Sequence, residues 1–456
     1  MEVAKNLYKV VKTNLFDIDF VLKSLVSVTL LSYAFGALFN SYTGQIYSQT
    51  ISFFVEDYWC DPKTQGVGVH CFGDFAAPSA IMNEKNPWDH VINIAYTPIN
   101  FLFFKLLNAE VIRSIDLHLP LLLNLILTVV ALVTPGLHMI MSTNSARIKS
   151  RGKLLLLLSL CSAPSLIIID RGASMFLLFP LVYFFYLSIQ KVERRKAMLI
   201  LFIMTLWKPQ MMFLAILIYT SFGFLSFVKI CAASVTGLVL SFVVYPHGLV
   251  QNLISWLENI REYQNYQSMP ALGNYSLVNF FSYLQAGWKF LIGNQSFIDA
   301  FTANLDSNRV SFISTMLIFV SGILVIINKQ TVTLLELIIA INLFLIVTPG
   351  VTFGYYLSLL LIPLFLHAQD SSHLLQKNNL FSKVWIGFYL FFLIALPAWP
   401  VSWGYLGLFR NYAWQYYGVQ WTFAHLTLSL LCLMLFVHFF NSWRKEKYPN
   451  KIAALI

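Results

Sequence analysis

Long apolar runs alternate with short basic or polar segments along the whole chain. The runs at 154–169 and 337–347 are continuous, whereas the strands of a membrane barrel would alternate apolar and polar residues. A helix needs roughly 17–25 mostly apolar residues to cross a bilayer, and many of the runs approach or reach that length. The pattern therefore predicts an all-α fold, a polytopic transmembrane helical bundle.

Apolar length and basic flanks together place about twelve membrane spans in one integral membrane domain over residues 1–456. The expected spans lie near 21–39, 117–141, 154–169, 175–189, 197–207, 211–228, 230–245, 310–327, 331–347, 355–367, 384–399 and 422–440. The first run is too long for the core of a cleavable signal peptide, so we interpret it as a retained span.

Composition supports the membrane assignment. The chain has 456 residues, of which 58% are hydrophobic and 11% are charged, with a mean hydropathy of +0.69. A soluble domain carries about 25% charged residues, so this chain has too few charges to cover a surface that faces water.

The net charge is +10, and the distribution of the basic residues along the chain indicates the membrane topology. With the N-terminus inside, 20 of the 30 basic residues fall in the short cytoplasmic segments, as the positive-inside rule expects. We therefore expect both termini in the cytoplasm, no nucleic-acid partner, and large exofacial loops at about 40–116, 246–309 and 400–421. Within these loops, 99–107 and 250–260 are expected to be helices at the membrane interface.

Unusual polar residues gather on the predicted exofacial side. They are Asp57, Asp61, Asp74, Asn86-Pro87-Trp88, Tyr96-Thr97-Pro98, Asp170-Arg171-Gly172, Lys208-Pro209-Gln210, Gly273-Asn274-Tyr275-Ser276 and Tyr355-Tyr356. Taken singly, each has a simpler interpretation: a solvated loop acid, a cation that reaches headgroup phosphates, or an aromatic belt. Charges at a membrane boundary are costly, however, so an acid and two cations on one face favour a functional site.

Two cysteines, Cys60 and Cys71, flank a polar stretch of the first exofacial loop. A disulfide between them is plausible outside the cytoplasm, although two cysteines in one loop also occur unbonded. The other three cysteines lie in apolar runs and are expected to be packing residues.

The ordered motifs resemble the GT-C glycosyltransferases, most closely family 87, whose members use polyprenyl-phosphate sugars. The resemblance covers roughly residues 57–363. It rests on the elements at Gly73-Asp74-Phe75, Asn86-Pro87-Trp88, Tyr96-Thr97-Pro98, Arg171-Gly172-Ala173, Lys208-Pro209, Gly273-Asn274-Tyr275-Ser276 and Pro349…Tyr355-Tyr356. The chain departs from the family pattern at Ala173, Tyr275 and Tyr355, and the identity of sugar and acceptor stays open.

The resemblance implies transfer of mannose or arabinofuranose from a polyprenyl-phosphate donor to a glycolipid or polysaccharide acceptor at the exofacial surface of the cell membrane. Asp74 is the expected general base, with Asp57 and Asp61 as substitutes in the same loop. Arg171 and Lys208 are expected to bind the donor phosphate.

Further substrate contacts are expected from Asn274, Tyr355 and Tyr356. Neither a metal nor a cofactor is required, because one base and a good leaving group suffice for direct attack. Direct attack predicts inversion at the anomeric carbon.

Two other classes of protein remain possible on the sequence alone. One is a transporter or flippase for lipid-linked sugars, which typically shows inverted repeats and polar residues near the bilayer midplane. We find no repeat, and Glu336 is almost the only acid within an expected span. The other is an envelope glycan ligase or polymerase, which would transfer a whole glycan.

Overall fold

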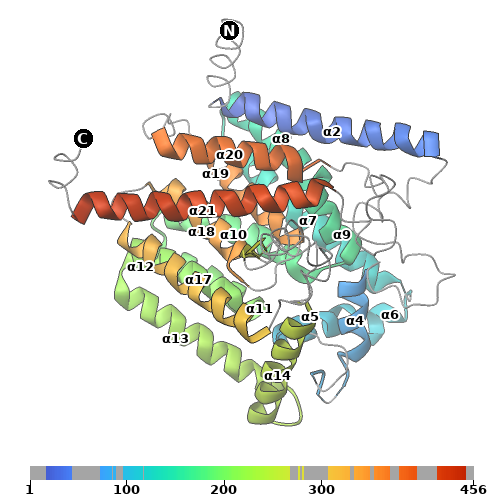
Figure 1. Ribbon diagram of the computed structural model, residues 1–456. Coiled ribbons are helices and arrows are strands. Elements are labelled where there is room, and N and C mark those ends of the chain that lie inside the picture. The colour runs from blue at the N-terminus through green and yellow to red at the C-terminus, as the bar shows by residue number, and fades with distance from the viewer. Residues whose placement is uncertain are drawn as a thin grey trace, which may run out of the picture.

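The chain folds into a bundle of helices with a smaller group of helices at one end (Figure 1). This computed structural model describes residues 17–43, 72–84, 86–88, 96–116, 118–267, 276–277, 280–281, 307–328, 333–349, 354–369, 379–397 and 419–447. All regular structure in those ranges is helical, and they contain no strand. The all-α prediction is therefore confirmed for the described part of the chain.

Every predicted span contains a helix or a pair of helices. The bundle consists of α2 (Ile18–Thr43), α7 (Leu119–Met141), α8 (Ala146–Cys161), α9 (Ala163–Arg171), η1 (Ser174–Leu177), α10 (Leu178–Gln190), α11 (Arg194–Trp207), η2 (Pro209–Leu214), α12 (Ala215–Phe222), α13 (Phe224–Ser241), η3 (Phe242–Val244), α17 (Ser307–Ile327), α18 (Leu334–Val347), η4 (Gly354–Leu360), α19 (Leu361–Gln369), α20 (Asn379–Ala395) and α21 (Val419–Lys447). The sequence pattern thus located most helix ends to within a few residues. Two predictions were wrong: α8 begins at Ala146 and not near 154, and the break expected at Lys229 lies at Gly223, so that Lys229 is inside α13.

Four helices in the described residues are long and apolar enough to cross a membrane. They are Ile18–Leu38, Leu119–Met141, Phe224–Val244 and Ala424–Asn441, and a bent pair formed by α8 and α9 would make a fifth. Six further apolar helices are shorter, with 10–17 residues. The count of about twelve spans accordingly stays a prediction.

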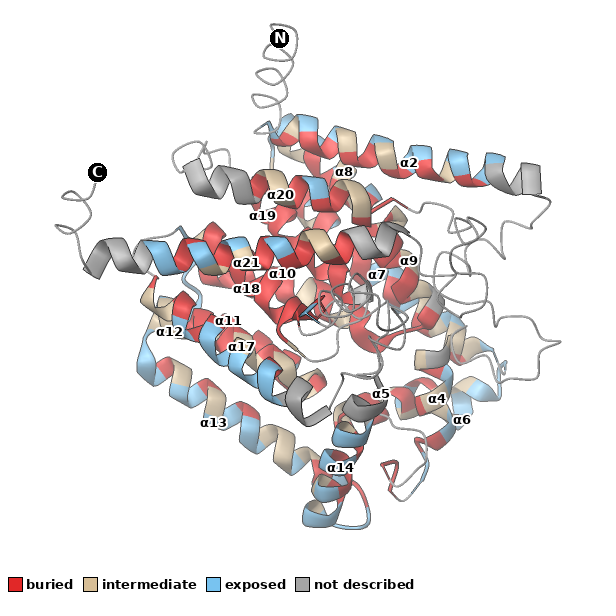
Figure 2. Cartoon of the chain, viewed as in Figure 1, coloured by how far each residue is buried: buried red, intermediate tan, exposed pale blue. Residues whose placement is uncertain are grey.

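Large apolar side chains are exposed along the outside of the bundle. Leu122 and Val130 on α7, Val235 on α13 and Phe312 and Phe319 on α17 are all more than 40% exposed. Figure 2 shows α13 and α17 at the outside of the bundle with exposed residues along their outer sides. A soluble monomer rarely exposes so much contiguous apolar surface, which marks this surface as one for lipid contact.

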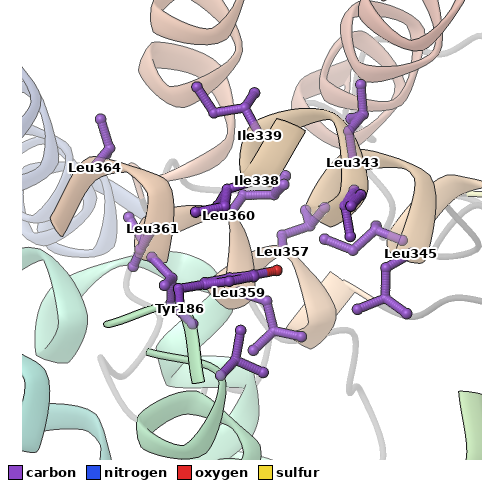
Figure 3. Close-up of a cluster of buried hydrophobic side chains, with 14 of the residues drawn as sticks. Tyr186, Ile338, Ile339, Leu343, Leu345, Leu357, Leu359, Leu360, Leu361 and Leu364 are labelled. Carbon is purple, nitrogen blue, oxygen red and sulfur yellow. The ribbon is translucent and has the colours of Figure 1, made fainter. Parts of the chain in front are cut away.

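The centre of the bundle is built from helices that are apolar on every side. All residues of α18 from Leu335 to Val347 are buried, and they pack with η4, α19 and Tyr186 of α10 (Figure 3). Glu336 does not face this core as a free acid, because it forms a capping box with Thr333 at the start of α18. The acid that sequence inspection singled out within an expected span therefore has a structural role at a helix end.

The third predicted span is not a straight helix. α8 ends at Cys161, α9 begins at Ala163, and the two axes differ by 54°. Pro164 in the first turn of α9 cannot continue the hydrogen bonding of α8, which explains the break. The freed backbone groups are satisfied across the bundle: Ala163 N donates to Leu396 O at 2.8 Å, and the Tyr33 hydroxyl donates to Cys161 O.

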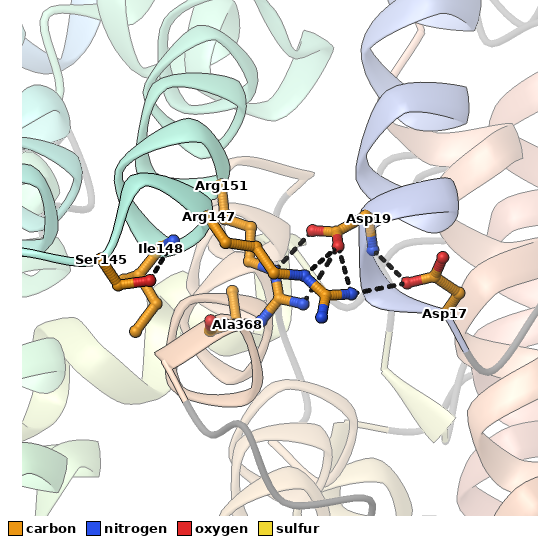
Figure 4. A network of polar contacts seen from close by, with 7 residues as sticks. All are labelled: Asp17, Asp19, Ser145, Arg147, Ile148, Arg151 and Ala368. Atoms are coloured by element: carbon orange, nitrogen blue, oxygen red, sulfur yellow. Dashed lines mark hydrogen bonds and ion pairs between the residues drawn. The ribbon is translucent and has the colours of Figure 1, made fainter.

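A charged cluster marks one end of the bundle (Figure 4). Asp19, at the start of α2, accepts from Arg151 Nε at 2.5 Å and from Arg147 Nε at 2.5 Å, and both arginines belong to α8. Arg151 also donates to Ala368 O of α19 at 3.0 Å. The starts of α2 and α8 and the end of α19 are thereby held together at one end, as the predicted topology requires.

We expect Arg151→Met to lower the free energy of unfolding by about 2–4 kcal/mol, because it removes the more buried of the two arginines that hold the Asp19 carboxylate. The Arg151 side chain is 6% exposed, whereas that of Arg147 is 64% exposed. Arg147→Met is therefore a matched control that should cost less than about 1 kcal/mol. Thermal unfolding in detergent measures both, and equal shifts of Tm would show that burial of the pair contributes nothing.

Four helices outside the predicted spans gather near the other end of the bundle. They are α4 (Gly73–Ile81), α5 (Pro98–Leu107), α6 (Glu110–Arg113) and α14 (Leu249–Gln267). The segments at 99–107 and 250–260 are confirmed as helices by α5 and α14, and their place at the membrane interface stays a prediction. In Figure 1 these helices lie beyond the ends of α9 and α13, away from the charged cluster at the start of α8.

Candidate active site

Asp74 stands in the first turn of α4, where the helix dipole favours a negative charge. The residue is partly exposed. Two positions earlier, Phe72 adopts a left-handed backbone conformation with φ of 55°, which an L-residue with a bulky side chain rarely does. A strained backbone of this kind is often found at functional sites, and here it sets the direction in which α4 begins.

The short helix α9 positions Arg171 near α4. Arg171 is the last residue of α9 and is 8% exposed. The next residue, Gly172, has φ of +61°, and a Cβ atom built there would lie 2.9 Å from the Cβ atom of Phe75. Asn124 of α7 donates to Gly172 O at 3.0 Å. The end of α9 therefore packs directly on the first turn of α4, next to Asp74.

Lys208 reaches the same corner from the end of α11. The helix stops there because Pro209 disfavours a helical conformation in the residue before it, and Lys208 is extended with φ of −140°. Its Nζ atom lies 5.2 Å from the centre of the Tyr96 ring. The Tyr96 hydroxyl donates to Asp74 O at 3.2 Å. Tyr96 thus joins the Lys208 ammonium to the backbone of Asp74.

A buried polar network joins the start of α5 to the segments that follow Arg171 and precede Lys208. Asn100 Nδ2 donates to Trp207 O at 2.7 Å, and Ser174 Oγ donates to Asn100 Oδ1 at 3.0 Å. Trp207 Nε1 completes the circuit by donating to Ser174 O at 3.1 Å. The Thr97 hydroxyl donates to Leu206 O at 2.8 Å and accepts from Asn100. Satisfied buried networks of this kind are rigid, so the backbone on which Lys208 and Arg171 stand is fixed.

The element Asn86-Pro87-Trp88 supports Tyr96 from the other side. Trp88 Nε1 donates to Tyr96 O at 2.9 Å, and Trp88 O accepts from Asn259 of α14 at 2.9 Å. The Trp88 ring is 3% exposed and stacks edge to face on Phe101 and Tyr245. This motif is therefore a support for the site, and no described contact places it at a substrate.

Tyr245 adds a second cation over an aromatic ring. Lys105 Nζ lies 5.1 Å from the Tyr245 ring centre, and the rings of Tyr245 and Tyr96 both stack edge to face on Phe101. Tyr245 is itself buried. The pair Lys105–Tyr245 is thus a structural counterpart of Lys208–Tyr96 that lacks a neighbouring acid in the described contacts.

Several residues expected at the site lie outside the described residues: Asp57, Asp61, Cys60, Cys71 and Asn274. Tyr355 is described only through its backbone in η4. Tyr356 is 5% exposed, and η4 packs against α9. The structure therefore brings together the segments of Asp74, Arg171 and Lys208. Tyr356 lies in η4, which packs against the helix that ends at Arg171.

Sequence inspection did not identify Asn100, Ser174 and Trp207 as supports of the site. The only signal was Asn100, a polar residue in an otherwise apolar segment that follows Pro98.

Among the described residues, no group of three or more His, Cys, Asp or Glu is placed to hold a metal ion.

The chain was compared with protein families, with curated proteins and with solved structures. No protein-family model matches the chain, and neither a curated protein nor a solved structure matches it significantly.

We expect Gly172→Ala to destabilise the protein by about 2–4 kcal/mol, because the new methyl group meets Phe75 and the backbone is left-handed. Gly223 also has a positive φ, of +84°, but a Cβ atom built there would meet nothing within 4 Å. Gly223→Ala should therefore cost only the conformational strain, about 1–2 kcal/mol. Differential scanning fluorimetry compares the two variants, and an equal loss of Tm would mean that α4 does not pack tightly on Gly172.

Proposed function

We propose that the protein is a membrane glycosyltransferase that moves a sugar from a polyprenyl-phosphate donor to a glycolipid or envelope glycan acceptor. The observation that carries the proposal is the corner in which Tyr96 joins Lys208 to Asp74 while the end of α9, with Arg171, packs on α4. A carboxylate and two cations on one corner fit a reaction that removes a proton and releases a phosphate.

The reaction has one bond-forming and one bond-breaking event at the anomeric carbon. The acceptor oxygen attacks that carbon, and the acceptor proton passes to the Asp74 carboxylate. The bond from the anomeric carbon to the phosphate oxygen breaks, and its electron pair leaves with the polyprenyl phosphate. The sugar is transferred with inversion, so a β-linked donor gives an α-linked product.

The two cations act on the leaving group. Negative charge grows on the phosphate as the bond breaks, and fixed positive groups lower the barrier where such charge develops. Lys208 is held at a short turn, and Arg171 offers two parallel hydrogen bonds to phosphate oxygens. Tyr96 keeps the ammonium of Lys208 in place through its ring.

We further propose that about twelve spans place this corner on the exofacial side of the cell membrane, with both termini in the cytoplasm. The charged cluster of Asp19 and Arg151 supports this topology, because α8 begins at the cluster and α9 ends at the candidate site. A basic cluster at the cytoplasmic end and a site at the other end agree with the positive-inside rule.

The test is sugar transfer by the purified protein in nanodiscs. Polyprenyl-phosphate mannose is supplied first, then the arabinofuranose donor, each with a panel of glycolipid acceptors. The proposal expects a glycosylated acceptor with one of the two donors. The proposal would be wrong if neither donor gave a product and the lipid-linked sugar moved between leaflets in protein-containing vesicles. The protein would then be a transporter.

A further inference from the structure

The helix α14 presents three different sectors around its axis. Its first sector faces the protein and combines polar residues with Trp256, which is 6% exposed and packs on the Phe242 ring. Asn252 Nδ2 donates to Phe242 O at 3.2 Å and to Tyr245 O at 3.1 Å, and Asn259 Nδ2 donates to Trp88 O. Ser255, also in this sector, accepts from Asn86 Nδ2 at 3.1 Å. Asn252, Ser255 and Asn259 therefore hold α14 against the protein by hydrogen bonds, next to the buried Trp256.

The second sector is apolar and exposed. Val250, Ile254 and Leu257 are 66%, 43% and 52% exposed, and their spacing of four and three residues puts them on one stripe. Arg261 continues the stripe one turn further on and is also exposed. Nothing in the described part of the chain covers this stripe.

The third sector is exposed as well, but it is polar. Gln251, Glu258 and Glu262 lie roughly a quarter of a turn around the helix from the apolar stripe. A helix with water on all exposed sides has no reason to separate apolar and polar residues into two exposed sectors. The separation indicates that the two exposed sectors face two different media: the apolar sector faces lipid and the polar sector faces water.

The apolar stripe continues the exposed apolar surface of α13. α13 is among the helices long enough to span, and its exposed outer residues include Val235 and Leu240. In η3, Val243 and Val244 are 59% and 56% exposed and lead from α13 toward α14. Figure 2 shows α13 and α14 meeting at one corner of the molecule, with exposed residues along their outer sides.

We propose that α14 lies in the membrane interface with Val250, Ile254 and Leu257 inserted among the acyl chains of the adjacent leaflet. Gln251, Glu258 and Glu262 then face water, and Arg261 reaches the phosphates of the headgroups. The helix is thereby a lipid-embedded brace at the end of the bundle that carries Asp74 and Lys208.

The brace is connected to the candidate active site by a short chain of hydrogen bonds. Asn259 donates to Trp88 O, and Trp88 Nε1 donates to Tyr96 O, while Tyr96 contacts Lys208 and Asp74. The depth of α14 in the leaflet thus sets the height of Tyr96 relative to the lipid phosphates. This last step rests on the proposed function, whereas the insertion of α14 does not.

The experiment places one fluorescent label in each exposed sector. Ile254→Cys and Gln251→Cys are made in full-length protein whose five native cysteines are replaced, labelled with an NBD maleimide and reconstituted in nanodiscs. We expect blue-shifted emission at position 254 and at least twofold stronger quenching there by lipids that carry a nitroxide on the acyl chain. The label at position 251 should emit as in water.

Labels that behave alike, with emission typical of water at both positions, would overturn the proposal. A second measurement covers the case in which the cysteine-free protein does not fold. A benzophenone amino acid at 254 or 251, in protein with its native cysteines, should crosslink to lipid from 254 only. Neither readout uses sugar transfer, so a failed glycosyltransferase assay and a failed insertion assay are told apart.

Discussion

Asp74→Asn is expected to reduce sugar transfer by about 10²–10⁴-fold, because an amide cannot take the proton from the acceptor hydroxyl. The asparagine side chain has nearly the same size and shape as the aspartate side chain. Asp74 stands at the start of α4, and its main chain, which the substitution leaves intact, accepts the hydrogen bond from Tyr96. The fold and the affinity for the donor should therefore be retained. Initial rates with saturating donor and a separate binding measurement on the same preparation check both parts.

The control for this variant is Asp116→Asn, which makes the same chemical change in the same predicted loop. Asp116 is exposed and accepts from the backbone of His118 through its carboxylate at 2.6 Å, a bond that an asparagine oxygen can also accept. Its rate should stay within about twofold of the wild type, as expected for a surface position. Transfer that survives Asp74→Asn would assign the base to Asp57 or Asp61.

Lys208→Gln is expected to lower kcat by about 10²–10³-fold, the usual effect of removing one group that stabilises charge in a transition state. The loss should appear mainly in kcat, because the charge on the phosphate grows as the bond to the sugar breaks. Gln keeps most of the length of the side chain, so the polar network around Asn100 and Trp207 should remain.

Lys105→Gln is the matched control, since Lys105 also lies over a tyrosine ring, that of Tyr245 at 5.1 Å. Loss of this cation–π contact should cost about 0.5–1 kcal/mol of stability and little activity. Equal losses of kcat in the two variants would mean that Lys208 acts by holding the fold and not by meeting the donor phosphate.

The helical fold was predictable because its signals are local. Continuous apolar runs between basic segments located α7, α10 and α21. The segment at 250–260 was also recognisable as a helix, although the pattern gave no account of its three sectors. Those sectors depend on which side of α14 meets Trp88, a contact with a residue more than 150 positions away.

The polar elements of the candidate site were visible in the sequence, but their arrangement was not. Arg171 and Lys208 both follow apolar runs, and that placed them on one face of the membrane. The break between α8 and α9 was missed because Pro164 lies inside an apolar run that reads as continuous. That break aims the end of α9 at α4, so the proximity of Arg171 to Asp74 required the tertiary structure.

Tyr96 illustrates the same limit. Its motif was noticed, but its role depends on two partners that come from distant segments, Lys208 and Asp74. No local pattern encodes a ring that joins a cation to a helix start. The supports at Ser174 and Trp207 are equally non-local, since each donates to a residue at least 33 positions away.

The anomeric configuration of the product tests the central claim most directly. NMR of the product formed by the wild-type protein from a β-linked polyprenyl-phosphate sugar reports the configuration of the new bond. A single base at Asp74 and direct attack predict an α-linked product, formed about 10²–10⁴-fold more slowly by Asp74→Asn. A product that keeps the β configuration would contradict the mechanism, because a single attack from the side opposite the leaving group must invert the anomeric carbon.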